Sequence, residues 1–151
     1  MNRKLIFITC FLLTFIFISC NRSKSEEATN ISNSAEEVIK SKVDLLRDIT
    51  PLFEDGDVNA VIEIPSGTLE KWELNKSTGQ VQRELVDNTP RVVNYLGYPG
   101  NYGMIPQTLL SREKGGDGDP LDILVLGPPS TRGGIVKCKI IGVLYLMDRG
   151  E

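Results

Sequence analysis

The stretch Gly115–Leu126, GGDGDPLDILVL, places three carboxylates within six residues and then continues directly into an apolar run. At an effective dielectric of about 20 and a separation of roughly 6 Å, each pair of these charges repels by about 3 kcal/mol. The repulsion is relieved either by water around an exposed turn or by cations between the carboxylates. The apolar run has the composition of a strand, so the stretch predicts an acidic turn that leads into a β-sheet.

The residues between the three carboxylates favour a compact turn. Gly118 separates Asp117 from Asp119 and allows a tight bend, Pro120 restrains it, and Asp122 lies on the strand itself. Hard oxygen ligands of this kind suit Mg²⁺, which keeps several waters and commonly shares a phosphate-bearing substrate. A calcium loop of the EF-hand type does not fit, because its glycine and its closing glutamate are missing from the required positions. A purely solvated acidic turn is the other interpretation.

The first part of the chain has the pattern of an export and anchoring signal. Residues 1–19 join a short basic start to an apolar run, which is typical of a secretory signal peptide. The run ends at Cys20, and this ending resembles the site where bacterial lipoproteins are cleaved and acylated; a flexible polar tether follows over residues 20–33. An uncleaved membrane anchor is the alternative, although the run is short for a span. Export leaves Cys138 as the only thiol, so we expect no internal disulfide.

The composition excludes several classes of function. The 151-residue chain has a formal net charge of −3, which argues against nucleic acid as a partner. It contains no histidine, so neither a Ser-His-Asp triad, a Cys-His nucleophile nor a His-ligated zinc site can be built. Hydrolysis by this chain would therefore activate water with carboxylates and hard cations.

Residues 34–151 have the length of one modest domain. Capping-box spacing between Ser34 and Glu37, followed by apolar residues at helical spacing as far as Pro51, predicts a helix at the domain edge. Beyond it, short apolar segments alternate with Gly and Pro. This pattern predicts a mainly β (α+β) fold, a small closed or partly closed barrel with a peripheral helix. The expected strands are residues 60–64, 71–74, 122–126, 135–141 and 143–147.

Several polar residues outside the acidic turn are candidates for a site. Glu63 interrupts an apolar strand, where it either meets a cation or donor or faces water from an edge. Lys71 and Glu73 share one face of the next strand, as the residues of an ordinary solvated face also do. Tyr98 and Tyr102 bracket a turn-rich loop, where their hydroxyls could donate to phosphate oxygens or their rings could pack the loop.

Together these motifs resemble the family I (soluble) inorganic pyrophosphatases over about residues 59–151. The family signature Asp-x-Asp-Pro-x-Asp is matched by DGDPLD at 117–122. VIEIP at 61–65, KWEL at 71–74 and GYPGNYGMIPQTL at 97–109 occur in the family's order. The resemblance implies a five-stranded OB-like β-barrel and Mg²⁺-dependent hydrolysis of diphosphate to two phosphates.

The resemblance also implies roles for individual residues. Asp119 matches the general base that orients the attacking water. The metal ligands are matched by Asp117, Asp122 and Asp148, the substrate contacts by Lys71, Tyr102 and an arginine, and the supporting positions by Glu63, Glu73 and Tyr98. For the arginine, Arg91 fits the spacing to Tyr98 better than Arg83 fits the distance from Lys71.

Three features depart from the family's pattern. An insertion at residues 111–116, SREKGG, lengthens the loop before the signature. The lipoprotein start predicts an exported protein, anchored to a bacterial membrane by lipid on Cys20, whereas the family's relatives are usually cytoplasmic. The family's next aspartate and lysine, then a Tyr-Lys pair and the terminal helix, are expected beyond Glu151, which predicts a C-terminally truncated domain. The alternative function is a noncatalytic surface module that binds divalent cations or phosphate without turnover, and a homo-oligomer is open in either case.

Overall fold

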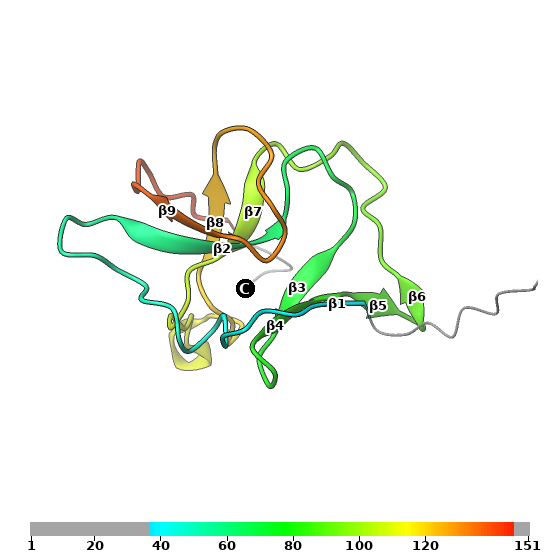
Figure 1. Cartoon of the computed structure of the whole chain (residues 1–151), viewed down its shortest axis with the longest axis horizontal. Helices are drawn as coiled ribbons and strands as arrows, with labels where there is room; N and C mark the ends of the chain where they lie inside the picture. Colours follow the sequence, from blue (N-terminus) through cyan, green and yellow to red (C-terminus); the bar gives the residue numbers. More distant parts are fainter. Residues whose placement is uncertain (1–36, 147–151) are drawn as a thin grey trace, which may run out of the picture. The chain divides into compact units, whose positions relative to one another are not determined.

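The structure, a computed structural model, describes residues 37–146 and shows the mainly β fold that the sequence predicts (Figure 1). The predicted signal peptide, Cys20, the tether and Asp148 lie outside the described residues. Within residues 37–146, the only helix is a short 3-10 helix at Arg112–Lys114. No helix in this range is long and apolar enough to cross a membrane.

A four-stranded antiparallel sheet contains the most buried strand of the fold. Its order is β8 (Asp122–Val125), β7 (Asn101–Met104), β2 (Val58–Ile64) and β9 (Ile135–Cys138). All residues of β2 except Asn59 are buried, because β2 pairs with a neighbour on each side. On β7, Gly103 lies opposite Ile62, where a Cβ atom would overlap the carbonyl oxygen of Val61. The glycine therefore allows β7 to approach β2 closely.

Two smaller sheets contain the remaining described strands. The strands β1 (Val38–Ile39), β4 (Gln80–Arg83) and β3 (Trp72–Asn75) form one sheet in that order. The hairpin of β5 (Leu85–Val86) and β6 (Thr89–Pro90) forms the other. Its two-residue turn, Asp87-Asn88, has positive φ at both positions, as a type I′ turn requires.

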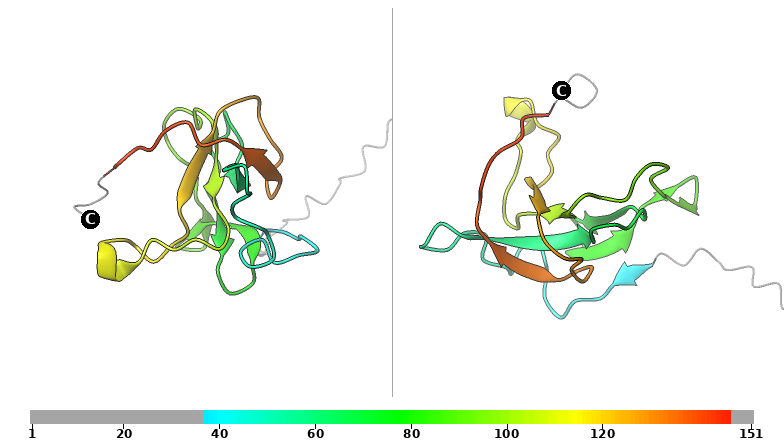
Figure 2. Two further views of the ribbon diagram at one scale, coloured as in Figure 1. Left: turned by 90° about the vertical axis from the view of Figure 1, so that its left-hand side faces the viewer. Right: turned by 90° about the horizontal axis from the view of Figure 1, so that it is seen from above.

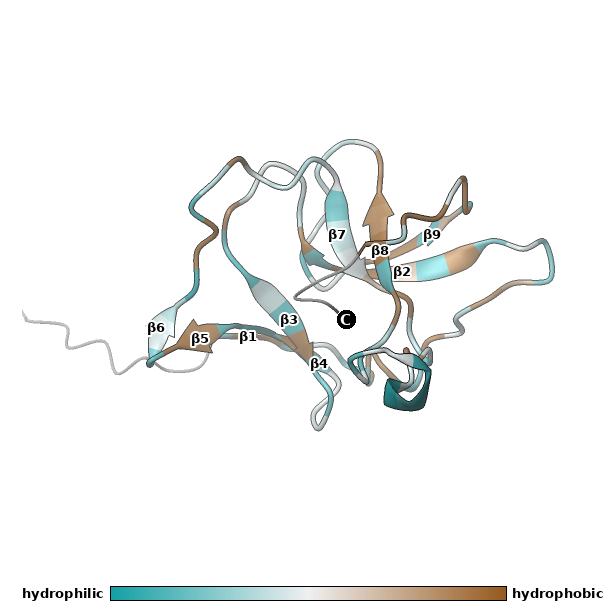
Figure 3. Cartoon of the chain, turned by 180° about the vertical axis from the view of Figure 1, so that it is seen from behind, coloured by the Kyte–Doolittle hydropathy of each residue, from teal (hydrophilic) through white to brown (hydrophobic). Residues whose placement is uncertain are grey.

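The hydrophobic core joins the four-stranded and the three-stranded sheet. Val61 and Ile64 from β2 pack with Trp72 from β3, Val81 from β4 and Met104 from β7. Leu45 completes this cluster from the segment after β1. Figure 3 shows apolar residues on β8 and along the segment after β9 as well, where many of them are exposed. Figure 2 shows that the loop with the 3-10 helix projects away from the strands.

The prediction of a peripheral helix is wrong in its described part, because residues 37–51 are not helical. Val38 and Ile39 instead form β1, which pairs with β4. The carboxylate of Asp44 accepts hydrogen bonds from the backbone N–H groups of Leu46 and Arg47, both at 2.9 Å, and folds the chain into turns. The apolar periodicity nevertheless identified real core contacts, since Leu45 is buried and Leu46 packs against the same cluster.

The predicted strands are confirmed at four of the five positions, by β2, β3, β8 and β9. The fifth, residues 143–147, is wrong in its described part, because residues 143–146 are exposed and pair with no strand there. The described strands form sheets of four, three and two, and no closed barrel is found among them. The short polar strands β4 and β7 were not predicted from the sequence.

Candidate functional site

Glu63 is the buried acid of the candidate site. It lies near the end of β2 with 6% of its surface exposed, and its Oε1 accepts a hydrogen bond of 2.6 Å from the backbone N–H of Leu74 on β3. Burial raises the pKa of Glu63 to about 7; the charge of Lys71 opposes this shift, while Asp122 and Glu73 add to it. The sequence-based alternative of an edge strand facing water is therefore wrong.

Lys71 and the two tyrosines lie together beside this carboxylate. The Nζ atom of Lys71 is 5.2 Å from the centroid of the Tyr102 ring, and the Tyr98 and Tyr102 rings lie 5.3 Å apart at 51°. Burial raises the pKa of Tyr102 well above its usual range, and a hydrogen bond to Asp122 raises it further. The hydroxyl is therefore a protonated donor at neutral pH, with Asp122 as its acceptor.

The acidic turn is an exposed loop closed by its own backbone. The N–H of Leu110 donates to the Asp119 carbonyl at 2.8 Å, and the N–H of Gly118 donates to the Leu110 carbonyl at 2.9 Å. The Asp117 carboxylate accepts the N–H of Asp119 at 2.8 Å, which fixes the bend. The Asp119 carboxylate forms an ion pair with Lys76, a residue of the β3–β4 turn. Sequence reasoning missed Lys76, because a lysine in a polar turn carries no distinguishing signal.

Arg91 and Arg83 occupy different surroundings. The exposed Arg91 pairs with Glu84 at 2.6 Å, and its carbonyl accepts the backbone N–H of Lys71 at 3.1 Å. Arg83 instead lies 5.7 Å from the Trp72 ring with its side chain 11% exposed. Burial raises the pKa of Glu73, and the negative charge of Glu84, a residue that the sequence did not single out, raises it further. The charges of Lys71 and Arg91 both lower the pKa of Glu73, so both cations lie near that carboxylate.

The structure brings together part of the predicted site. Asp122 and Glu73 raise the pKa of Glu63, and Lys71 lowers the pKa of both glutamates. These four side chains therefore lie close together. Within residues 37–146, no three His, Cys, Asp or Glu side chains converge closely enough to hold a metal ion, and Asp148 lies outside this range. Glu63 and Asp122 are nonetheless carboxylates, the type of ligand that Mg²⁺ prefers. In the described part of the chain, no Lys or Arg forms an ion pair with either of them.

Comparison with known proteins places this chain in a family. The sequence model of the family described as inorganic pyrophosphatase matches residues 60–151. The chain is 42% identical over 92 residues to the inorganic pyrophosphatase of Campylobacter jejuni, covering 60% of this chain and 48% of that protein. It is 43% identical over 94 residues to that of Caulobacter vibrioides, covering 61% and 48%. The chain belongs to the inorganic pyrophosphatase family.

Solved structures of inorganic pyrophosphatases share the fold. The type I inorganic pyrophosphatase of P falciparum matches with a TM-score of 0.65 and 27% identity, over 75% of this chain and 42% of that one. The vacuolar soluble pyrophosphatase of Trypanosoma cruzi in its apo form matches with a TM-score of 0.66 and 25% identity, over 70% and 33%. The chain spans about half the length of the curated relatives it matches.

Proposed function

We propose that the whole protein hydrolyses inorganic diphosphate to two phosphates with a divalent cation, Mg²⁺ by the chemistry of its ligands. Family membership supports the reaction class. The observation that supports it in this chain is the juxtaposition of a buried acid with a cation and a donor. Glu63 lies beside Lys71, whose ammonium group lies over the ring of Tyr102.

The proposed ligands of the cation are Asp117, Asp122 and Asp148, with Glu63, Glu73 and Tyr98 in support. Such a cation, when bound, lowers the pKa of a coordinated water and offsets the charge of the phosphates. Asp122 is already fixed as a hydrogen-bond acceptor for Tyr102. Asp117 is fixed by the backbone of its own turn.

The chain's own residues then bind the substrate and move the proton. Lys71 and Arg91 supply positive charge to the anionic substrate. The Tyr102 hydroxyl, which donates to Asp122 in this structure, turns to donate to a phosphate oxygen when a cation binds Asp122. Asp119 accepts the proton of the attacking water as general base. It lies on an exposed loop, so water can reach its carboxylate, which pairs with Lys76 in this structure.

The finer predictions on architecture and location are part of the same proposal. We propose that β2, β3, β4, β7 and β8 or β9 belong to an OB-like barrel, which is supported by the core that the two larger sheets share. We also propose lipid attachment at Cys20, export and membrane anchoring, on the sequence pattern of residues 1–20. Mass spectrometry of the N-terminal peptide from the native host tests the lipid directly, and loss of the lipid in Cys20→Ala is the expected result. A homo-oligomer is tested by light scattering.

The decisive experiment measures phosphate release from diphosphate by the purified whole protein, with Mg²⁺ and with excess chelator. Release that requires Mg²⁺ supports the proposal. If the protein binds Mg²⁺ and diphosphate in calorimetry but releases no phosphate, the noncatalytic binding module is the correct function instead.

A further inference from the structure

We propose that Arg132, which lies in the loop between β8 and β9, is a positioning residue that sets Glu63 and Lys71 at the correct distance for catalysis. The inference rests on the proposed function. It concerns the junction between β2, which carries Glu63, and β3, which follows Lys71. These two strands belong to different sheets and share no backbone ladder. Besides the connecting segment, side-chain contacts hold them together, among them the bond of the Glu63 carboxylate with the Leu74 N–H.

Arg132 is attached to β2 by its own loop. The N–H of Gly133 donates to the Ile62 carbonyl at 2.6 Å, and the N–H of Ile62 donates to the Gly134 carbonyl at 2.9 Å. The side chain of Arg132 adds a third link, since its Nε donates to the Glu63 carbonyl at 3.1 Å. Arg132 is thus held against the backbone of the residue whose carboxylate enters the site.

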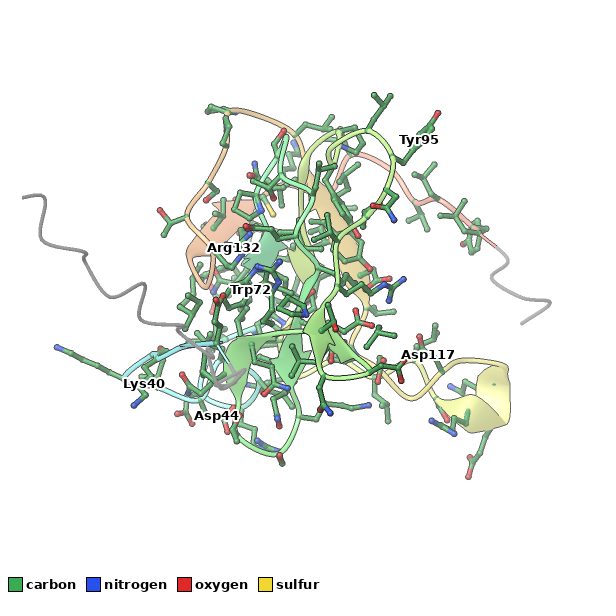
Figure 4. All side chains as sticks on the ribbon, turned by 90° about the vertical axis from the view of Figure 1, so that its right-hand side faces the viewer. Lys40, Asp44, Trp72, Tyr95, Asp117 and Arg132 are labelled. Atoms are coloured by element: carbon green, nitrogen blue, oxygen red, sulfur yellow. The ribbon has the colours of Figure 1, made fainter. Side chains whose placement is uncertain are left out.

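From this attachment the guanidinium of Arg132 reaches across to the segment that contains β3. Its Cζ atom lies 4.5 Å from the centroid of the Trp72 ring, and one of its terminal nitrogens lies 3.0 Å from Oε2 of Glu70. Figure 4 shows Arg132 and Trp72 close together and far from Asp117. The Arg132 side chain is 17% exposed, so water screens these contacts only in part.

Trp72 and Glu70 carry the constraint to the site residues. Trp72 is 4% exposed and stands between Lys71 and Glu73 in the chain, so its buried ring anchors the backbone that carries both of these neighbours. Glu70 directly precedes Lys71, and its other carboxylate oxygen lies 3.6 Å from Arg83. The planar guanidinium of Arg132 contacts the Glu63 carbonyl, the Trp72 ring and Glu70 at once. A lysine ammonium cannot reproduce that fork geometry.

The chain offers a matched control for this arginine. Lys137 on β9 is also a cation over an aromatic ring, 4.4 Å from the centroid of Phe53, and it also pairs with a carboxylate, Asp55 at 2.6 Å. None of these three residues is part of the proposed site. Comparison of Arg132→Met with Lys137→Met therefore separates positioning of the site from the loss of a cation, ring and carboxylate contact in general.

The test measures steady-state hydrolysis of diphosphate by the whole protein and by the variants Arg132→Met, Arg132→Lys and Lys137→Met. Misplaced catalytic groups lower turnover, so we expect kcat of Arg132→Met to fall about 10- to 100-fold while KM changes less than about threefold. Arg132→Lys should recover only part of this loss. Lys137→Met should keep kcat within about twofold of the wild type.

Fluorescence of Trp72, the only tryptophan in the chain, supplies a second readout. Its emission should move to longer wavelength in Arg132→Met and stay unchanged in Lys137→Met, because only the first substitution opens the ring to water. An unchanged kcat in Arg132→Met, or full recovery by lysine, would overturn the positioning role even if the melting temperature falls. Absence of turnover in the wild type would instead overturn the proposed function, on which this role depends.

Discussion

Glu63 and the acidic turn from Asp117 to Asp122 carry the same charge in opposite surroundings. Glu63 lies in the most buried strand, where removal of water raises its pKa to about 7. Asp117 and Asp119 lie on an exposed loop, where water, a backbone N–H and Lys76 surround their carboxylates. In the proposed mechanism these surroundings correspond to two roles. The loop carries the proposed general base, Asp119, and β2 holds an acid whose ionised form is favoured by the Leu74 N–H and by a nearby cation such as Lys71.

The largest effect is expected at the loop. Asp119→Asn removes the proposed proton acceptor, so we expect kcat for diphosphate to fall about 100- to 10,000-fold. The melting temperature should change little, because the side chain is exposed and its ion pair is on the surface. Steady-state assays and thermal unfolding measure the two quantities. Asp55→Asn, at an exposed acid outside the site, is the control; equal losses in both variants would refute the role of Asp119.

The next effect concerns stability at Glu63. Its folded pKa of about 7 is above the usual 4.5, so the folded state binds the proton more tightly than the unfolded state does. The contribution is fully present below pH 4.5 and is lost as the pH rises through about 7, which amounts to about 3 kcal/mol. Urea unfolding at a series of pH values, without divalent cations, measures it.

Glu63→Gln is the matched control for that measurement, because the amide oxygen can still accept the Leu74 N–H but does not titrate. The pH dependence between 4.5 and 7 should be smaller in this variant by the contribution of Glu63, while Glu73, whose pKa is also raised, still titrates. A slope identical to that of the wild type would show that another group is responsible.

A smaller effect is expected from the metal. Mg²⁺ at a hundredfold excess over its dissociation constant should stabilise the wild type by about 2.7 kcal/mol and raise its melting temperature by about 10 °C. Asp122→Asn should lose most of this increase, because a carboxylate ligand becomes a neutral amide. Thermal unfolding with and without Mg²⁺ decides the matter. An increase of the same size in both proteins would contradict a role for Asp122 as ligand.

The smallest effect is expected at Lys76. Its ion pair with Asp119 joins two half-exposed side chains, so Lys76→Met should reduce stability by only about 0.2–1 kcal/mol. Denaturant unfolding at low and high salt tests this, since the difference between the two proteins should shrink as salt screens the pair. If Lys76→Met lowered the free energy of unfolding by several kcal/mol, the ion pair would have to be buried, which contradicts an exposed loop.

The sequence was most informative where one local signal decided the outcome. The apolar run around Glu63 and the run after Pro120 became β2 and β8, because burial on a sheet face favours such residues. The clustered motifs also led to Lys71, Tyr98 and Tyr102, which the structure brings together.

The remaining features depend on contacts between distant parts of the chain, which local patterns do not contain. The helical spacing before Pro51 was overruled by pairing of β1 with β4 and by the side-chain bonds of Asp44. The strand β4, QVQR, is polar and lacks a clear alternation signal. The contact of Arg132 with Glu63 spans 69 residues and that with Trp72 spans 60 (132 − 72), so no local window of sequence could have shown them.

Gly103 sets a practical limit on how this protein can be diversified. A methyl group at this position would overlap the Val61 carbonyl, and relief would require β7 to separate from β2. Tyr102 is the adjacent residue on β7, so the same movement would displace it from Lys71. In a saturation library we therefore expect almost only glycine at position 103. Gly56 has open space around it, so substitutions there should be limited only by its left-handed backbone conformation.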